Sequence, residues 1–373
     1  MPTEPVRLIQ VGAGMMGWAW LNIIGSSTEV RLVGLADLNL EVAQRAATAA
    51  GFANVATAPT LEDLLGRVEA DAVVNVTIPE AHADVSIAAL QHGLSVLCEK
   101  PVAHTMAAAA EVSGRLLMVS QSRRYWRNLE ALRGQITRLG RIGIVECSFF
   151  RGPHFGGFRE EMPYPLLADM AIHQFDLARH LIGSEPVWIR SESFNPDWSW
   201  FAGDAAAQVA AAFADGTRFG FTGSWCSAGV QTSWNGSWRI SGADGTAVWD
   251  GDHEPVAQTA EGEPIPAVPG TDPEELAGSL HEFVSALRGG SMPANEVHRN
   301  VMSLAMVEAA IRSAQTGERA LLTDLLDEAY EQALATERRP ELRAALASWP
   351  SVHEVIGGRT ATVPDGPPNE GAG

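Results

Sequence analysis

The only lysine of the chain, Lys100, is the residue whose type and position most clearly suggest chemistry. Arginine supplies the rest of the 26 strong cations, so one site carries an ammonium where all others carry a guanidinium. An ammonium is compact and can lose its proton when buried, whereas a guanidinium is planar and permanently charged. Lys100 follows the apolar run 94–98, a pattern typical of a buried strand. A functionless surface lysine is the alternative, but the carboxyl ends of open parallel sheets face ligand crevices, which favours a ligand-facing cation.

A second candidate site lies on one face of the helix predicted over residues 166–182. Asp169, His173, Asp176 and His180 are spaced at i, i+4, i+7 and i+11, which places them along one helical face. Asp169 and His173 are best placed for proton transfer, because a carboxylate can orient an imidazole whose ordinary pKa lies near neutrality. His180, late in the helix, can instead complement the helix dipole. A solvated face and a His/Asp metal site are the alternatives, and the lack of a further His or Cys cluster favours no metal.

A glycine-rich loop near the N-terminus predicts a dinucleotide site. Gly12, Gly14 and Gly17 form G-x-G-x-x-G between a strand pattern and a helical pattern. Backbone amides at such a helix N-terminus can approach a pyrophosphate. Asp37 ends the next strand pattern, where its carboxylate can bind ribose hydroxyls, with capping of the next turn as the alternative. No arginine directly follows Asp37, so we predict NAD as the cofactor, with NADP disfavoured.

Length, composition and charge limit the classes of protein to which this chain can belong. With 373 residues, 46% of them apolar, the chain can build two domains with sizeable cores. Its formal charge of −19, with scattered arginines, opposes binding to nucleic acid or to an anionic membrane. Cys98, Cys147 and Cys226 lack metal-ligand spacing and fit reduced thiols of the cytosol. No apolar run reaches about 18 residues and the first strand pattern starts at Val6, so we predict a cytoplasmic protein without a signal peptide or membrane segment.

Two kinds of periodicity divide the chain, and together they predict an α/β protein. Residues 6–120 alternate between short apolar strand patterns and helical patterns, which predicts a Rossmann-type, doubly wound parallel sheet. After Tyr125 the sequence indicates a helix at residues 126–138, a strand at 142–150, a loop at 151–165 and another helix at 166–182. Strand-like runs then continue to about Asp250. This order predicts a second, α+β domain with a large, mostly antiparallel open sheet.

The changes of pattern set the expected boundaries. We expect a nucleotide-binding Rossmann domain at residues 1–122 and a substrate-binding and oligomerisation domain at residues 123–322. Extra C-terminal helices are expected at 323–356 and a disordered tail at 357–373. Within the second domain, residues 251–271 have the composition of a spacer that ends at Asp272, the expected N-cap of a helix closed by glycines. A later helix, 297–316, is expected to pack back toward the first domain.

Five stretches together resemble the glucose–fructose oxidoreductase, inositol dehydrogenase and rhizopine-catabolism family, abbreviated Gfo/Idh/MocA. They are GAGMMG, LADLN, VTIPEAH, LCEKPVAHT and DMAIHQFDLARHLIG, and the similarity runs from about residue 6 to 316. The most specific element is Glu99-Lys100-Pro101 combined with Asp169-x-x-x-His173. Ala171 departs from the pattern, because members of the family often carry glycine there, so its methyl group is expected to reduce clearance for the substrate.

The resemblance implies roles for individual residues. Lys100 and His173 would flank the reacting carbinol, with Asp169 in support. The cofactor-binding residues that we expect are Gly12, Ala13, Gly14, Met15, Met16, Asp37, Thr77, Ile78, Pro79, His82, Glu99 and Lys100. For the substrate, aromatic and hydrogen-bonding side chains suit a polyol, although each could instead serve packing. The substrate residues that we expect are Arg124, Tyr125, His154, Asp169, His173 and Trp234.

We therefore expect an NAD-dependent oxidoreductase that acts on CH–OH groups, oxidising a secondary alcohol of a sugar, an inositol-like cyclitol or a glycoside. His173 would take the hydroxyl proton while Lys100 stabilises negative charge on the oxygen. The family also contains enzymes that retain NAD and use transient oxidation for hydrolysis or elimination, and regulators that bind nucleotide without turnover. The intact Lys100, Asp169 and His173 argue against a regulator. An exposed second-domain sheet predicts a homodimer or homotetramer.

Overall fold

A computed structural model describes residues 4–356, so the tail expected at 357–373 lies outside the described residues. Residues 6–120 form a six-stranded parallel sheet in the order β3-β2-β1-β4-β5-β6. Its strands are β1 Val6–Val11, β2 Val30–Ala36, β3 Ala56–Ala58, β4 Ala72–Asn75, β5 Ser95–Glu99 and β6 Leu117–Ser120. The order reverses between β1 and β4, where doubly wound sheets open their ligand crevice. The predicted Rossmann sheet is confirmed, with β3 as an additional short edge strand.

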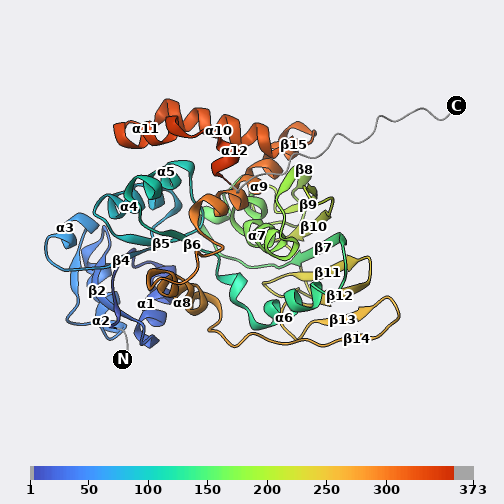
Figure 1. Cartoon of the computed structure of the whole chain (residues 1–373), viewed down its shortest axis with the longest axis horizontal. Helices are drawn as coiled ribbons and strands as arrows, with labels where there is room; N and C mark the ends of the chain where they lie inside the picture. The colour runs from blue at the N-terminus through green and yellow to red at the C-terminus, as the bar shows by residue number, and fades with distance from the viewer. Residues whose placement is uncertain (1–3, 357–373) are drawn as a thin grey trace.

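Helices connect these strands and cover the sheet (Figure 1). They are α1 Met15–Ser26, α2 Leu40–Ala49, α3 Leu61–Leu65, α4 Pro79–Gln91 and α5 His104–Ser113. The side chain of Asn39 caps α2 by accepting from the amides of Glu41 and Val42, and that of Thr60 caps α3 through Asp63. In contrast, α1 and α4 begin without a side-chain cap. Because α4 begins with Pro79, which has no amide hydrogen, it is the start of α1 that keeps free amides for a ligand.

The second half of the chain builds a nine-stranded sheet in the order β14-β13-β12-β11-β7-β10-β9-β8-β15. Its strands are β7 Ile142–Phe150, β8 Pro186–Phe194, β9 Ala206–Phe213, β10 Arg218–Ser224, β11 Ser237–Gly242, β12 Gly245–Trp249, β13 Val256–Thr259, β14 Pro264–Ile265 and β15 Ala320–Leu321. Every described pairing is antiparallel except that of β7 with β10. The predicted mostly antiparallel sheet is confirmed.

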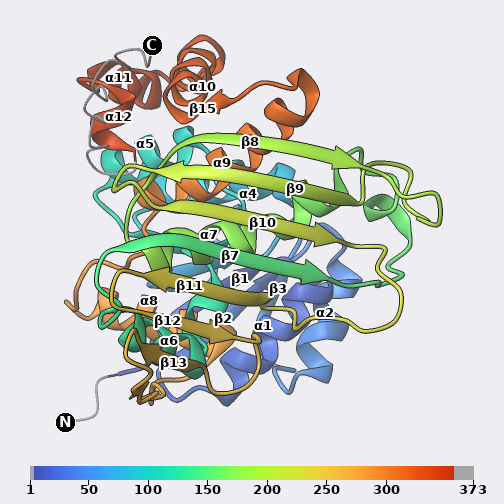
Figure 2. The same cartoon turned by 90° about the vertical axis from the view of Figure 1, so that its right-hand side faces the viewer.

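One face of this second sheet packs on helices, and the other is open. Along β11 the buried Trp238 and Ile240 alternate with exposed Ser237 and Arg239, the pattern of a strand with one core face. Figure 2 shows the broad outer face turned to the viewer, with the helices behind it. An uncovered sheet face of this size suits self-association, so the expected homodimer or homotetramer stays a prediction.

Two expectations about the segment before α8 were wrong. Residues 251–271 are not a spacer, because they contain β13 and β14, whose Ala257 and Ile265 are each 3% exposed in the core. Asp272 is not the N-cap either: α8 spans Glu275–Leu287 and begins after Glu274 without a side-chain cap. Short edge strands rich in Pro, Gly and Glu give little periodic signal, and they form because β12 offers a partner.

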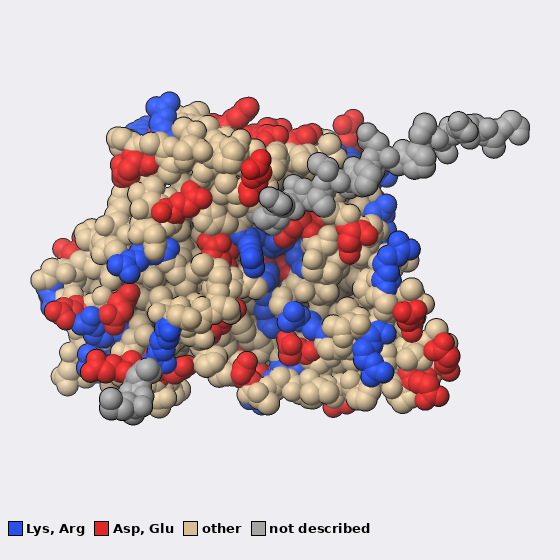
Figure 3. Space-filling view, in the orientation of Figure 1, with Lys and Arg blue, Asp and Glu red and all other residues tan. Residues whose placement is uncertain are grey.

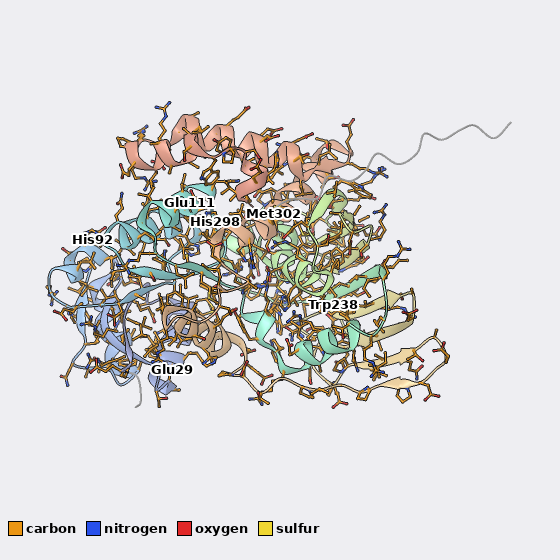
Figure 4. The ribbon with its side chains drawn as sticks, in the orientation of Figure 1. Glu29, His92, Glu111, Trp238, His298 and Met302 are labelled. Atoms are coloured by element: carbon orange, nitrogen blue, oxygen red, sulfur yellow. The ribbon has the colours of Figure 1, made fainter. Side chains whose placement is uncertain are left out.

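Helix α8 packs on the first domain although it lies far along the chain. Its Leu280, Phe283 and Val284 share a core with Trp20 and Leu21 of α1, beside which α8 lies in Figure 1. A hydrogen bond joins the same two regions, with Nδ1 of His281 lying 2.9 Å from the carboxylate of Glu29, which is labelled in Figure 4. The expected domain division at residue 122 therefore does not describe where α8 lies.

The last helices also reach back to the first domain. They are α9 Val297–Thr316, α10 Leu322–Thr336, α11 Pro340–Ser348 and α12 Val352–Val355, and α10 and α11 cross α5 (Figure 1). Glu111 of α5 accepts a 2.6 Å hydrogen bond from the indole nitrogen of Trp349. Its other oxygen lies 3.2 Å from Nε2 of His298 on α9, and Figure 4 labels both Glu111 and His298. The C-terminal helices thus hold the helix that follows the Glu99-Lys100-Pro101 motif.

Candidate functional site

The glycine loop after β1 leaves space where a dinucleotide phosphate would lie. Gly12 has φ +105°, and a Cβ there would lie 2.4 Å from the carbonyl oxygen of Val76. A Cβ on Gly17 would lie 2.4 Å from the carbonyl oxygen of Gly12, so only glycine lets α1 pack this close to the loop. A Cβ on Gly14 would meet nothing within 4 Å. Together with the uncapped start of α1, this open space fits a pyrophosphate bound by backbone amides.

Asp37 is held beside this loop at the end of β2. One carboxylate oxygen accepts from the amide of Ala13 at 2.9 Å, and the other accepts from the amide of Asn39, also at 2.9 Å. The second bond is the turn-capping role considered as the alternative, and the first turns Asp37 toward the glycine loop. Each oxygen keeps a lone pair for a ribose hydroxyl. Met15 and Met16 are 83% and 45% exposed at the start of α1, where a bound cofactor would cover them.

His82 links two loops at the carboxyl edge of the first sheet. Its Nδ1 lies 3.1 Å from the carbonyl oxygen of Pro101, and its Nε2 lies 3.1 Å from that of Thr77. Burial lowers the pKa of His82, so the ring is neutral at neutral pH and one nitrogen donates at a time. His82 is only 2% exposed, so it holds the loops of Thr77 and Pro101 in position from inside the protein. Ile78, in contrast, is 66% exposed and faces the crevice side of the loop.

Lys100 follows β5 and reaches the second domain. Its Nζ donates to the carbonyl oxygen of Asp169 at 3.1 Å and to a carboxylate oxygen of Asp169 at 3.4 Å. Both side chains are 19% exposed, so the ammonium is partly shielded yet reachable. Glu99 turns the other way and accepts from the indole nitrogen of Trp20 at 3.0 Å, and burial raises the pKa of its carboxyl. The structure therefore brings Lys100 and Asp169 together across 69 residues of sequence.

The helix that carries Asp169 and His173 begins as a π-helical turn. Residues Leu166–Met170 are π-helical, with the amide of Ala171 donating to the carbonyl oxygen of Leu166, and α7 spans Ala171–Ile182. Single π turns inside helices are frequent at functional sites. The wider turn changes the register of Asp169 relative to the regular helix that the sequence predicts. Ala171 is 0% exposed, so its methyl group packs in the core, contrary to the expected loss of clearance.

His173 is a neutral imidazole beside two cations. Burial lowers its pKa well below the ordinary 6.5, and Arg123 and Lys100 lower it further. Its Nδ1 is buried without a hydrogen-bond partner among the described residues, which leaves Nε2 as the nitrogen open to the site. The carboxylate of Asp169 bonds to Lys100 and, at 2.8 Å, to Nε of Arg159. Asp169 therefore orients cations, and the expected orientation of the imidazole by this carboxylate is not seen.

Two expected substrate residues are placed in structural contacts. Arg124 donates from Nε and Nη2 to both oxygens of Asp176, at 2.6 and 2.7 Å, and is 9% exposed. The hydroxyl of Tyr125 bonds to Glu282 of α8 and accepts from Asn295 at 3.2 Å. Because their polar groups are occupied inside the protein, neither residue forms a substrate wall, contrary to the expectation. The sequence offered no sign of these partners, which lie 52 and more residues away.

The arginine one position earlier faces the site instead. Nη1 of Arg123 donates to the carbonyl oxygen of Trp234 and, at 3.0 Å, to the side-chain oxygen of Asn235. Arg151 lies nearby, with its guanidinium carbon 4.4 Å from the centre of the Trp234 ring. Trp234 is 37% exposed, as a substrate-facing aromatic side chain would be. His154 lies in the loop 151–165 with Arg151 and is exposed. It stacks on Trp200, with ring centres 3.9 Å apart, and not on Trp234.

Sequence reasoning missed three arginines of this region, namely Arg123, Arg151 and Arg159. Arg159 bonds to Asp169 and lies over Phe158, with its guanidinium carbon 4.8 Å from the ring centre. A partial signal existed, because Arg151 and Arg159 both lie in the loop 151–165, which also carries His154, one of the expected substrate residues. Nothing in the sequence distinguishes Arg123 from Arg124, since adjacent residues in a short 3-10 turn, Ser122–Tyr125, point in different directions.

Comparison with known proteins follows the same division of the chain. A family described as "Oxidoreductase family, NAD-binding Rossmann fold" matches residues 6–121, and one described as "GFO/IDH/MocA C-terminal domain" matches residues 135–248. The chain belongs to the Gfo/Idh/MocA oxidoreductase family. Its first domain is an NAD-binding Rossmann domain, and the predicted resemblance and cofactor class are confirmed.

Relatives of this Gfo/Idh/MocA protein match along most of their length. The rhizopine catabolism protein MocA of Rhizobium meliloti is 28% identical over 82% of this chain and 93% of its own length. The inositol 2-dehydrogenase of Rhizobium meliloti strain 1021 is 26% identical, with 83% and 96% covered. An oxidoreductase from Agrobacterium radiobacter, solved in complex with NAD+, L-tartaric acid and magnesium, superposes with a TM-score of 0.79 at 18% identity, covering 87% of this chain and all of that one. That structure supports the fold.

The described part of this Gfo/Idh/MocA chain contains neither a cluster of metal ligands nor a helix suited to cross a membrane. Within residues 4–356 no group of three or more His, Cys, Asp or Glu side chains is arranged to hold a metal ion. Over the same residues, no helix combines the length and the apolar character that crossing a membrane requires. The three cysteines, Cys98, Cys147 and Cys226, are buried as free thiols.

Proposed function

We propose that this protein is an NAD-dependent dehydrogenase that oxidises a secondary alcohol of a sugar, cyclitol or glycoside to the ketone. The observation that carries the proposal is the placement of one ammonium, Lys100, and one neutral imidazole, His173, beside each other at the cofactor edge of the first sheet. Asp169 links the two groups, because it accepts from Nζ of Lys100 and lies four residues before His173. The pKa of His173, which burial, Arg123 and then Lys100 lower, supports this placement. A general base must be unprotonated at working pH, and burial provides this.

The chain's own residues can divide the chemistry in a simple way. His173 would accept the hydroxyl proton at Nε2, because Nδ1 is buried. Lys100 would donate from Nζ to the same oxygen as negative charge develops on it, while Asp169 holds the ammonium in place. The nicotinamide, when bound, supplies the acceptor for the carbinol hydride. The buried His82 would keep the loops that carry Thr77 and Pro101 at their positions.

The cofactor proposal extends to a preference for NAD over NADP. Asp37 places a carboxylate where the adenosine ribose would bind, with no arginine directly following it. A 2′-phosphate there would meet a negative charge, whereas hydroxyls would be hydrogen-bond donors to it. Calorimetric titration with both cofactors tests this, and comparable or tighter binding of NADP would show the assignment to be wrong.

The main experiment measures NADH formation against a panel of inositols, aldoses, anhydrosugars and glycosides. A dehydrogenase should form one NADH for each molecule of substrate consumed, measured by absorbance and by chromatography of the same reaction. Substrate consumption without NADH release would instead identify an enzyme that retains NAD and uses oxidation transiently. Binding of a sugar without any consumption would identify a sensor. Either result would overturn the proposal.

A further inference from the structure

Arg123 and Arg151 bind the same short segment before β11, and neither bonds to a carboxylate. Nη1 of Arg123 donates to the carbonyl oxygen of Trp234 and to the side chain of Asn235. Nη1 of Arg151 donates to the carbonyl oxygen of Thr232 at 2.8 Å. Among residues 4–356, Nε of Arg151 is a buried donor without a partner, and Nε and Nη2 of Arg123 have none either. Each guanidinium therefore keeps unused donors at the site.

The two arginines that are buried within residues 4–356, Arg124 and Arg179, are both neutralised. Arg124 forms a two-bond pair with Asp176, and Arg179 forms one with Glu185 at 2.6 and 2.5 Å. Burying a guanidinium costs free energy unless an opposite charge and hydrogen bonds compensate it. Among residues 4–356, Arg123 has no hydrogen-bonded carboxylate. Burial lowers its pKa to about 10, the negative charge of Glu275 opposes this shift, and the positive charge of Arg151 adds to it. A shielded guanidinium without a hydrogen-bonded carboxylate can take an anionic ligand as its partner.

The charge around the reacting groups is also unbalanced toward positive. Lys100, Arg123, Arg151 and Arg159 face the site, while Asp169 is the carboxylate that bonds to two of them. In the face shown in Figure 3, several Lys and Arg side chains lie along the middle, with Asp and Glu side chains between them. This occurs in a chain whose formal charge is −19. A local excess of cations within an acidic protein concentrates anionic ligands at that place.

We propose that the substrate carries a carboxylate, which the free Nε/Nη2 edge of Arg123 binds with both oxygens. Arg124 shows this geometry within the same protein, since it uses its Nε/Nη2 edge for both oxygens of Asp176. The edge of Arg123 remains open because Nη1 alone is occupied by Trp234 and Asn235. Two parallel N–H groups match a planar carboxylate. The substrate class is therefore a sugar acid or a cyclitol acid, and Arg151 adds a second positive charge.

This inference rests on the proposed dehydrogenase function, which it deepens. The carbonyl oxygen of Trp234 accepts from Arg123 and, at 3.4 Å, from Gln174, the residue that follows His173. Arg123 therefore lies close enough to His173 for one small molecule to reach both. Binding the carboxylate to Arg123 would orient the carbinol between Lys100 and His173. An acid is thereby distinguished from its neutral analogue, because the analogue leaves the cation unpaired.

The test compares acids with neutral analogues of the same shape. D-glucuronate and D-galacturonate, together with the corresponding uronamides, are titrated by calorimetry into the full-length protein saturated with NADH, and then assayed for NADH formation with NAD. At least one acid should bind about 10- to 100-fold more tightly than its amide, as expected for a charged hydrogen-bonded pair. If every amide binds as tightly as its acid, the carboxylate proposal is overturned, whatever the rates of oxidation.

A variant assigns the effect to Arg123. Arg123→Gln should reduce the acid-to-amide affinity ratio toward 1, whereas Arg141→Gln, which removes an exposed arginine at the start of the turn before β7, should keep the ratio. An acid-to-amide affinity ratio that stays high in Arg123→Gln would show that another group binds the carboxylate, and the assignment to Arg123 would be wrong.

A separate titration uses glucose 6-phosphate. If it binds more tightly than either uronate, the proposed carboxylate substrate is overturned in favour of a phosphate. Preferential binding of an acid without NADH formation from any compound would leave carboxylate recognition supported and the dehydrogenase function refuted.

Discussion

The two ends of helix α7 carry similar sets of side chains and use them differently. At its start, Asp169 and His173 lie with Lys100 and Arg159. Toward its end, Asp176 and His180 lie with Arg124 and Arg179. Each end thus has a carboxylate, an imidazole and two cations. Sequence spacing alone treats them as one polar stripe.

The difference lies in how completely the hydrogen bonds are satisfied. Asp176 is 1% exposed and accepts from Arg124 at 2.6 and 2.7 Å and from Ser303 at 2.7 Å. Lys100 bonds to Asp169 at the longer distances of 3.1 and 3.4 Å, and both are partly exposed. A saturated cluster fixes structure, whereas a cluster with unused donors and acceptors can still bind a ligand. Saturation of the carboxylate, rather than residue type, separates the two ends.

The largest expected effect tests the two imidazoles against each other. His173→Ala should lower kcat by about 10²- to 10⁴-fold, because the proton acceptor is lost, with little change in NAD affinity. His180→Ala, the matched change at the other end, should leave kcat within a few-fold of wild type. Steady-state kinetics and calorimetry with NAD measure both. Equal losses in the two variants, or near-normal kcat in His173→Ala, would remove the distinction between the ends and the acid–base role.

The reverse difference is expected for stability when the two carboxylates are compared. Asp176→Ala should lower the free energy of unfolding by about 3 to 5 kcal/mol, since it leaves Arg124 buried without its partner. Asp169→Ala removes more exposed contacts and should cost about 1 kcal/mol or less. Urea denaturation followed by circular dichroism measures both values, and Asp176→Asn serves if the alanine variant does not fold. A larger loss at Asp169 than at position 176 would contradict the structural role of the second cluster.

Lys100→Arg tests whether the first cluster needs an ammonium or only a positive charge. The variant should fold and bind NAD, yet lose about 10-fold or more in kcat, because a planar fork cannot occupy the position of Nζ beside Asp169. The matched change at the saturated end, Arg124→Lys, should affect the melting temperature more than kcat. A Lys100→Arg enzyme with normal kcat would show that charge alone suffices.

The smallest effects concern pH. We expect pH to act on kcat/KM through His173 and on the free energy of unfolding through His180. Because the pKa of His173 lies well below 6.5, kcat/KM for oxidation should be level above about pH 6.5 and fall in more acidic solution as the imidazole binds a proton.

Burial, followed by Arg124, Arg133 and Arg179, lowers the pKa of His180 as well. Below pH 6.5 the unfolded chain then binds more protons than the folded one, so stability should fall as pH falls.

Two measurements separate these contributions. The pH profile of kcat/KM should move in a His173→Gln enzyme and stay in His180→Gln. The loss of urea stability between pH 7 and pH 5 should become smaller in His180→Gln than in wild type. An acid-side fall in kcat/KM centred above pH 6.5 would show that His173 is not the group that titrates.

The cofactor half of the site was open to prediction from the sequence because its chemistry belongs to contiguous backbone. Gly12, Gly14 and Gly17 act within one loop, and the requirement that Gly12 and Gly17 lack a Cβ is a local property of that loop. Asp37 follows at the end of the neighbouring strand, and parallel strands bring such ends to one edge. The hydrophobic periodicity and the glycine positions are therefore enough to predict the Rossmann domain. The family motif around Lys100 is likewise contiguous in the sequence and could be recognised there.

Only the tertiary structure decided which polar side chains of the second domain are free. Arg123 and Arg124 are neighbours in sequence with equal propensities, and the partner that occupies Arg124 comes from α7, 52 residues later. Lys100 likewise meets its carboxylate 69 residues away. Residue types specify what each group can do, but whether a charge is paired depends on distant elements that pack against it, and no local pattern records that pairing.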